Sequence, residues 1–272
     1  MIKKITPVLA AAVLLAPAGA HARTTPAAMA ALGDSISAGF NACGWYVSCT
    51  SRSWSAGDFP SVNSHYLRLL AMSGAIKGHN LNFAAPGATS ADLAGQARKA
   101  ADAGAGYVTV LIGAQDACRG SEKEMTPVGT FRRNIDKAFD VLRPTGARIF
   151  VASIPDVKRL WRVGKDNGWA RLFWAVGRIC PSMLANPRST AKKDEARRDR
   201  VRERVMDYNT QLRQACEKYG PACRHDGGAV FSHPFTLKHV SAWDYFHPNA
   251  EGQKVLAKIT FDAGFFSDAV EP

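Results

Sequence analysis

Residues 28–39 read AMAALGDSISAG, an apolar run followed at once by a glycine, an acid and a serine. The run from Ala28 to Leu32 has the length and composition of a buried β-strand. Gly33 permits a tight turn, so that Ser35 stands just past the end of the strand, where a helix can begin. This position exposes a hydroxyl group and directs backbone N–H groups toward a bound group. Taken alone, however, a serine in this place is more often a helix N-cap.

Further apolar runs of strand length alternate with helical patterns along the rest of the chain. This alternation predicts an α/β fold, a parallel sheet covered by helices, and no repeat or linker divides it. Pro248 suits the first turn of a helix, and Asn249 and Glu251 suit its positive end. The other expected strands are 81–84, 108–112, 149–154 and 229–231, and the expected helices are 61–76, 90–103, 127–142, 190–219 and one that starts after Pro248.

Small and polar residues follow four of the expected strands, at 33–35, 86–89, 113–116 and 155–156. Because the loops after parallel strands share one edge of the sheet, where ligands usually bind, we expect these loops to converge.

A second polar cluster, Asp244-Tyr-Phe-His247-Pro248, lies near the other end of the chain. An aspartate three residues before a histidine can accept a hydrogen bond from one ring nitrogen and leave the other free to take a proton from a serine. An exposed loop histidine is the alternative. In combination with Ser35, the cluster favours a Ser-His-Asp arrangement.

The first residues of the chain are typical of a secretory signal. Residues 1–22 contain two lysines, an apolar stretch and the small-residue end Ala20-His21-Ala22, and the stretch is too short to span a bilayer. We therefore expect residues 23–272 to form the mature protein, secreted and without a transmembrane anchor; an uncleaved anchor is the alternative. Loss of Lys3 and Lys4 lowers the formal net charge from +12 to +10.

Six cysteines remain in the expected mature chain, and an even count in an exported protein points to disulfides. Proximity in the sequence favours pairing Cys43 with Cys49 and Cys216 with Cys223, which leaves Cys118 for Cys180, although six cysteines allow about 15 pairings.

Residues 157–209 differ in composition from the rest of the chain. Four large aromatic residues come first, and a strongly charged stretch, 192–204, follows. We interpret the segment as a helical insertion packed on the sheet, with charged residues that pair at three- and four-residue spacing. A lid or an acyl-chain wall built from the aromatic residues is the alternative. Because acids and bases are mixed in 192–204, we expect no nucleic-acid binding. The aromatic residues are Trp161, Trp169, Phe173 and Trp174.

Four blocks of the chain resemble the SGNH, or GDSL, hydrolase family, especially its secreted, disulfide-bonded bacterial esterases and lipases and its phospholipase-B-like members. The resemblance extends from about Ala31 to Gln253. The blocks are LGDSISAG at 32–39, SRSWS at 51–55, NFAAPGAT at 82–89 and DYFHPN at 244–249. The resemblance implies a three-layer α/β/α sandwich similar to flavodoxin and no metal or organic cofactor.

The same resemblance implies a role for each site residue. Ser35 would be the nucleophile, His247 the general base and Asp244 the residue that orients His247. The N–H groups of Ser35 and Gly87 would form part of the oxyanion hole. Where the family pattern is Gly-x-Asn-Asp, this chain has Gly-Ala-Gln115-Asp. Gln115 has the same amide group as the expected asparagine, on a side chain longer by one methylene group.

We therefore expect a serine hydrolase that cleaves carboxylic esters. Lipases, esterases and phospholipases all belong to this class. Two alternatives remain open, a carbohydrate acetylesterase and a low-activity ligand-binding member of the family, the second because of Gln115. The expected partner is an ester or lipid small molecule. The expected protein is a monomer whose positive charge aids attraction to anionic surfaces.

Overall fold

A parallel five-stranded sheet forms the centre of the protein, of which the computed structural model describes residues 25–267. The strand order is β2-β1-β3-β4-β5, so the chain moves from β1 to one side and then returns to the other side through β3. Ligands bind at the carboxyl edge of such sheets, where this reversal opens a crevice. The strands are β1 Met29–Gly33, β2 Asn80–Asn82, β3 Tyr107–Leu111, β4 Arg148–Val151 and β5 Cys223–His225.

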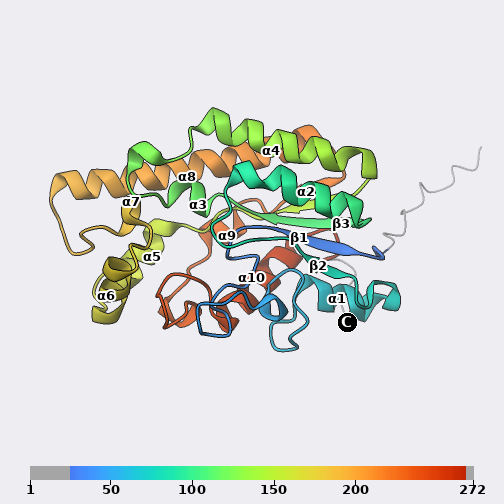
Figure 1. The fold of residues 1–272 in the computed structure, drawn as a ribbon, viewed down its shortest axis with the longest axis horizontal. Helices are drawn as coiled ribbons and strands as arrows, with labels where there is room; N and C mark the ends of the chain where they lie inside the picture. The colour runs from blue at the N-terminus through green and yellow to red at the C-terminus, as the bar shows by residue number, and fades with distance from the viewer. Residues whose placement is uncertain (1–24, 268–272) are drawn as a thin grey trace, which may run out of the picture.

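Helices cover both faces of the sheet (Figure 1). The longer ones are α1 His65–Met72, α2 Leu93–Asp102, α4 Val128–Leu142, α5 Val157–Gly164, α6 Gly168–Val176, α8 Lys192–Tyr219 and α10 Ala250–Asp262. Single turns form α3 Ala114–Ala117, α7 Pro181–Leu184 and α9 Ala229–Ser232. Short 3₁₀ turns occupy Thr50–Arg52, Gly74–Ile76, Ser90–Asp92, Glu122–Glu124, Arg143–Thr145 and Leu237–His239.

Alternate residues of β1 divide the core into two layers. Ala30 and Leu32 pack with α2, α4 and α8, whereas Met29 and Ala31 pack with α1 and α10. Every residue of β1 is buried, as expected for a strand covered on both faces. The α/β class and the three-layer arrangement with a central parallel sheet are therefore confirmed.

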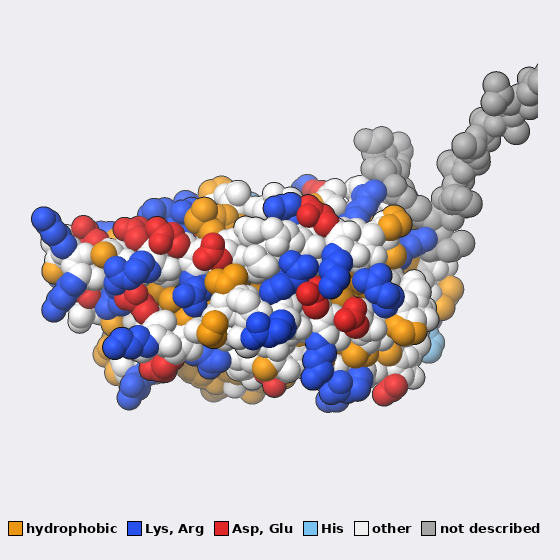
Figure 2. Space-filling model, turned by 90° about the horizontal axis from the view of Figure 1, so that it is seen from above, with side chains coloured by type: hydrophobic (Ala, Val, Ile, Leu, Met, Phe, Trp, Pro, Cys, Tyr) orange, Lys and Arg blue, Asp and Glu red, His pale blue; other side chains and the backbone are white. Residues whose placement is uncertain are grey.

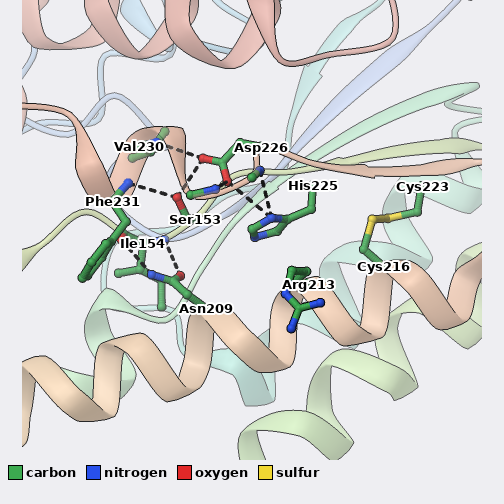
Figure 3. A network of polar contacts seen from close by, with 12 residues as sticks. Ser153, Ile154, Asn209, Arg213, Cys216, Cys223, His225, Asp226, Val230 and Phe231 are labelled. Atoms are coloured by element: carbon green, nitrogen blue, oxygen red, sulfur yellow. Dashed lines mark hydrogen bonds and ion pairs between the residues drawn. A yellow bond between two sulfur atoms is a disulfide. The ribbon is translucent and has the colours of Figure 1, made fainter.

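The fifth strand lies elsewhere than the sequence pattern predicted. Residues 229–231 begin helix α9, and the strand is Cys223–His225. Figure 3 shows the reason: the carboxylate of Asp226 accepts hydrogen bonds from the N–H groups of Gly228 and Val230, at 2.9 and 3.0 Å, and so caps the helix. The true strand is short and partly exposed, so it lacks the apolar run on which the prediction depended.

Helix starts differ from the prediction by a few residues. Helix α1 begins at His65, after Ser64 accepts a hydrogen bond from the Leu67 N–H at 3.2 Å. At α10 the side chain of Asn249 caps the Gly252 N–H at 2.9 Å, which places Pro248 before the helix rather than in its first turn.

All three predicted disulfides are present. Cys43–Cys49 closes a small loop after β1, and Cys118–Cys180 joins the end of α3 to the start of α7. Cys216–Cys223 joins α8 to β5 (Figure 3).

Residues 157–209 contain α5, α6, α7 and the first part of α8. In the charged stretch, the pair Asp194–Arg197 shows the expected three-residue spacing, at 2.9 Å. Other charges pair with different elements instead, such as Arg200 with Glu122 at 2.7 Å. Figure 2 shows acidic and basic side chains interspersed on the face seen from above.

The expected signal segment 1–22 lies outside the described residues. Within residues 25–267, none of the helices has the length and apolar character needed to cross a membrane.

Candidate active site

Three side chains from opposite ends of the chain form a hydrogen-bonded row at the carboxyl edge of the sheet. His247 Nε2 lies 2.9 Å from Ser35 Oγ, and His247 Nδ1 lies 2.6 Å from Asp244 Oδ2. Ser35 follows β1, whereas Asp244 and His247 lie on the loop before α10. The sequence predicted that these three residues would meet, and the structure brings them together. A serine, a histidine and an acid in this order have the geometry for transferring a proton from the hydroxyl group.

The turn that presents Ser35 requires a glycine before it. Gly33 has φ +138°, and a Cβ atom there would lie 2.0 Å from the carbonyl oxygen of Leu111 on β3. Gln96 of α2 holds the same residue from the other side: its Oε1 accepts from the Gly33 N–H at 2.7 Å, and its Nε2 donates to the Gly33 carbonyl at 2.9 Å. The start of the turn is therefore fixed by buried backbone contacts.

The rest of the turn is held by side chains from three distant segments. Gln253 of α10 donates to the Ile36 carbonyl at 2.9 Å, and Asn82 of β2 donates to the Ser37 carbonyl at 2.9 Å. The hydroxyl of Ser53 also donates to the Ser37 carbonyl, at 2.7 Å. Segments that lie far apart in the sequence thus meet at the turn that carries Ser35.

Asp244 is buried but well supplied with donors. Its Oδ1 accepts from the N–H groups of Phe246 and His247 at 2.9 and 3.0 Å, and its Oδ2 accepts from Asn41 Nδ2 at 2.5 Å as well as facing His247. Burial by itself raises the pKa of Asp244, but the hydrogen bond and charge of His247 and the two N–H groups outweigh it and hold the pKa below its usual value. Asp244 is therefore an anion at neutral pH.

The pKa of Asp34, the neighbour of Ser35, is shifted in the opposite direction. Burial raises its pKa to about 7, and the N–H groups of Ile36 and Ala114 and the nearby His247 offset only part of that effect. Its Oδ1 accepts from the Ile36 N–H at 3.0 Å, but its buried Oδ2 has no partner among the described residues.

Two further loops reach the same edge. Gly87 lies in the exposed loop after β2 with φ +82°, and Gln115 lies on α3 after β3 and lines the pocket beside Ser35. Asp116 fastens the two loops together, because its carboxylate accepts from the N–H and the hydroxyl of Ser90 at 2.8 and 2.7 Å. The amide of Gln115 forms no hydrogen bond within residues 25–267, and so it is available to a ligand.

An apolar pocket opens beside Ser35, Gln115 and His247. Helix α5 forms one wall with Val157, Leu160 and Val163, and the facing walls include Phe235, Val240 and Phe246. The 157–209 segment thus contributes to the pocket wall, but through the aliphatic side chains of α5 and not through its aromatic residues.

The four aromatic residues considered for this wall lie away from the pocket lining. Trp161 packs under the guanidinium of Arg198, 4.2 Å from its ring centre, and Trp174 Nε1 donates to the Tyr245 carbonyl at 3.1 Å. Phe173 packs near Tyr245, and Trp169 is exposed. The idea of an acyl-chain wall built from these four side chains is therefore wrong.

Sequence reasoning missed several residues of the site. Asn41 had no sequence signal, because its role depends on a contact with a residue 203 positions away. The spacing of Val157, Leu160 and Val163, three residues apart on one helix, was a usable signal for the pocket wall. His233 and His239, which belong to none of the sequence blocks, also line the pocket.

Within the part of the chain that the structure describes, no group of three or more histidine, cysteine, aspartate or glutamate side chains is arranged to hold a metal ion.

Solved structures similar to this chain share its fold. LAE5, an α/β hydrolase enzyme from the Lake Arreo metagenome, aligns with a TM-score of 0.54 at 18% identity, over 86% of this chain and 93% of LAE5. A putative lipolytic protein of the G-D-S-L family from Desulfitobacterium hafniense aligns with a TM-score of 0.52 at 14% identity, over 88% and 99%. A variant of Axe2, an acetyl-xylooligosaccharide esterase from Geobacillus, aligns with a TM-score of 0.50 at 15% identity, over 86% and 92%.

No curated protein matches the sequence significantly. The model of one protein family, the GDSL-like lipase/acylhydrolases, matches residues 29–260, which include all four sequence blocks and the row from Ser35 to Asp244. This chain is therefore a member of the GDSL-like lipase/acylhydrolase family.

Proposed function

We propose that the protein is a secreted serine hydrolase that cleaves carboxylic esters through an acyl-enzyme. The observation that carries the proposal is the row of Ser35, His247 and Asp244 at the mouth of an apolar pocket. The three disulfides support a site of action outside the reducing cytoplasm.

In the proposed first step, Ser35 Oγ attacks the ester carbonyl carbon while its proton passes to His247 Nε2. The anion of Asp244 stabilises the resulting imidazolium and keeps the second proton on Nδ1. The tetrahedral intermediate then collapses, the bond to the alcohol oxygen breaks, and the alcohol leaves with the proton from His247. Ser35 is left as an ester of the acyl group.

In the second step, water replaces the alcohol. His247 takes a proton from the water as its oxygen attacks the acyl carbon, and the proton returns to Ser35 Oγ when the acid is released. We assign the negative oxygen of both intermediates to the N–H groups of Ser35 and Gly87 and to the side-chain amide of Gln115. The free amide of Gln115 beside Ser35 supports its inclusion.

The apolar walls of α5 and of the loop at Phe235 support an acyl group longer than acetyl. Hydrolysis of a series of p-nitrophenyl esters of increasing acyl length tests this part. We expect kcat/KM to rise from acetyl to medium chains and to fall in Leu160→Trp for the longer chains only. An acetyl-restricted profile would favour the carbohydrate acetylesterase instead.

Replacement of Ser35 tests the reaction itself. We expect Ser35→Ala to abolish ester turnover while the variant unfolds at the temperature of the wild type. Gln115→Ala should lower kcat by about 10²–10³, the usual effect of losing one oxyanion donor. A folded wild-type protein that binds esters without turnover would instead show a ligand-binding member of the family.

A further inference from the structure

The exposed large hydrophobic side chains of the described chain are concentrated in two regions. Nine such side chains are exposed, and seven of them belong to one of these regions. The first region comprises the loop residues Trp45, Tyr46 and Val47 with Trp243, and the second comprises Trp169, Leu172 and Val176 on one side of α6. Soluble proteins rarely gather apolar side chains in this way unless the surface binds something.

The two regions are joined by the loop that contains Asp244. Trp45 stacks on Trp243 with ring centres 5.2 Å apart, and Phe173 of α6 lies 5.9 Å from the ring of Tyr245. In Figure 1, α6 and the loops before α10 and after β1 lie on the lower side of the molecule, away from α4 and α8. We call the seven residues together the aromatic face; it borders the candidate active site.

The loop part of this face is held in place against a backbone preference. Trp45 and Tyr46 have φ values of 80° and 49°, in the left-handed region that bulky residues rarely adopt. The Cys43–Cys49 disulfide closes the loop, and the Tyr46 hydroxyl donates to the Trp243 carbonyl. These contacts keep Trp45, which is 73% exposed, directed into solvent rather than folded into the core. Such strain is typical of functional surfaces.

The segment that contains α6 is strongly basic. Residues 157–191 contain seven lysines and arginines and one acid, Asp166. Their net charge of +6 is half of the protein's net charge of +12. Arg171 lies on α6, and Arg178, which is exposed, comes two residues after its end. Some of the charge is engaged elsewhere, since Lys158 pairs with Asp199 and Lys165 pairs with Asp166. The α6 part of the aromatic face therefore carries positive charge, from Arg171 and Arg178 beside the helix.

We propose that the aromatic face binds a lipid surface that contains anionic headgroups. Tryptophan and tyrosine favour the boundary between lipid and water, leucine and valine enter the acyl region, and basic side chains attract anionic headgroups. A polysaccharide would use the tryptophan rings but would leave Leu172, Val176 and the positive charge without partners. The docking is independent of turnover, but the supply of ester from the lipid layer to Ser35 rests on the proposed function.

Vesicle flotation of the Ser35→Ala protein tests the proposal without hydrolysis of the lipid. The vesicles consist of phosphatidylcholine with or without phosphatidylglycerol. We expect binding to the anionic vesicles, and an affinity lowered by about tenfold or more when Trp169, Leu172 and Val176 are all changed to serine, because the buried apolar area is lost. Thermal unfolding shows that the variant is folded.

Met206→Ser is the matched control. Met206 is also an exposed apolar residue, but it lies on α8 and does not belong to the aromatic face. This change should leave vesicle binding within about twofold. The proposal is overturned if the triple variant binds as well as its parent, if neutral vesicles bind as tightly as anionic ones, or if the protein binds an insoluble polysaccharide and no vesicles. A wild-type protein that binds the anionic vesicles but turns over no ester would count against the proposed function alone.

Discussion

Two aspartates of the candidate site are equally buried and have opposite pKa shifts. Asp34 and Asp244 are each 1% exposed, yet the pKa of Asp34 is raised to about 7 and the pKa of Asp244 is lowered. Asp34 belongs to the serine side of the site and has one oxygen without a partner among the described residues. Asp244 belongs to the histidine side, where each of its oxygens has two partners.

The difference shows that the hydrogen-bond donors and charges around each carboxyl group, together with its burial, set the direction of its pKa shift. Desolvation favours the neutral acid at both positions, and only at Asp244 do the hydrogen bonds and the charge of His247 outweigh it. Pairs of neighbouring groups with opposite shifts are typical of sites where each has a separate chemical task. On the histidine side Asp244 is therefore an anion at neutral pH, whereas on the serine side Asp34 keeps its proton up to about pH 7.

Exchanging each acid for its amide gives the largest expected contrast. Asp244→Asn should lower kcat by about 10⁴, because an amide cannot keep the proton on His247 Nδ1 or stabilise the imidazolium. Asp34→Asn should lower kcat by no more than about tenfold, since the amide resembles the neutral acid in shape and charge. Steady-state kinetics on a soluble ester at neutral pH measures both. Equal losses in the two variants would contradict the assignment of separate tasks.

The raised pKa of Asp34 predicts how stability depends on pH. Because the folded protein holds this proton up to about pH 7 and the unfolded chain loses it near the ordinary aspartate pKa of 3.8, the free energy of unfolding should fall as pH rises between these values. Relative to Asp34→Asn, the wild type should lose about 2–4 kcal/mol between pH 4 and pH 8.

Urea unfolding of both proteins across this range measures the difference. The buried His65, whose pKa burial lowers to about 3, destabilises both proteins equally as pH falls below about 6.5, so its effect cancels in the comparison. A constant difference between the two proteins would show that folding does not raise the pKa of Asp34.

Removing one donor from Asp244 should have a smaller effect on the histidine side. Asn41→Gly deletes the hydrogen bond to Asp244 Oδ2 and suits the φ of 61° at this position. A hydrogen bond to a charged group contributes about 1.5–3 kcal/mol, so we expect kcat/KM to fall by about 10- to 100-fold. Asn63→Gly is the matched control. Like Asn41, Asn63 has a positive φ, but its side chain is exposed, whereas that of Asn41 is buried. Equal kinetics for the two variants would exclude a role for Asn41.

Much of the fold and of the site was predictable from local patterns. Apolar runs followed by small polar loops predicted four of the five strands, and parallel strands necessarily bring their carboxyl ends to one edge. Ser35 and His247 therefore had to approach one another once the strand and helix beside them were assigned. Short separations in the sequence likewise indicated two of the disulfides, and elimination indicated the third.

The failures occurred where the structure depends on partners that are distant in the sequence. Residues 229–231 form a helix because Asp226 and Ser153 satisfy its first N–H groups, and no local pattern reveals that contact. Trp161 and Trp174 likewise contact Arg198 and the Tyr245 carbonyl, partners that lie 37 and 71 positions away in the sequence.

Periodicity and spacing in the sequence predicted a parallel sheet covered by helices and favoured the three disulfide pairs and a Ser-His-Asp arrangement, and the family resemblance implied the three-layer sandwich and a role for each of the three residues. The contact of Asn41 with Asp244, the pocket wall formed by α5, and the opposite pKa shifts of Asp34 and Asp244 arise only in the folded protein. The physical reason is that burial and hydrogen-bond partners belong to the packed chain, and these set the pKa of a carboxyl group and the direction of a side chain.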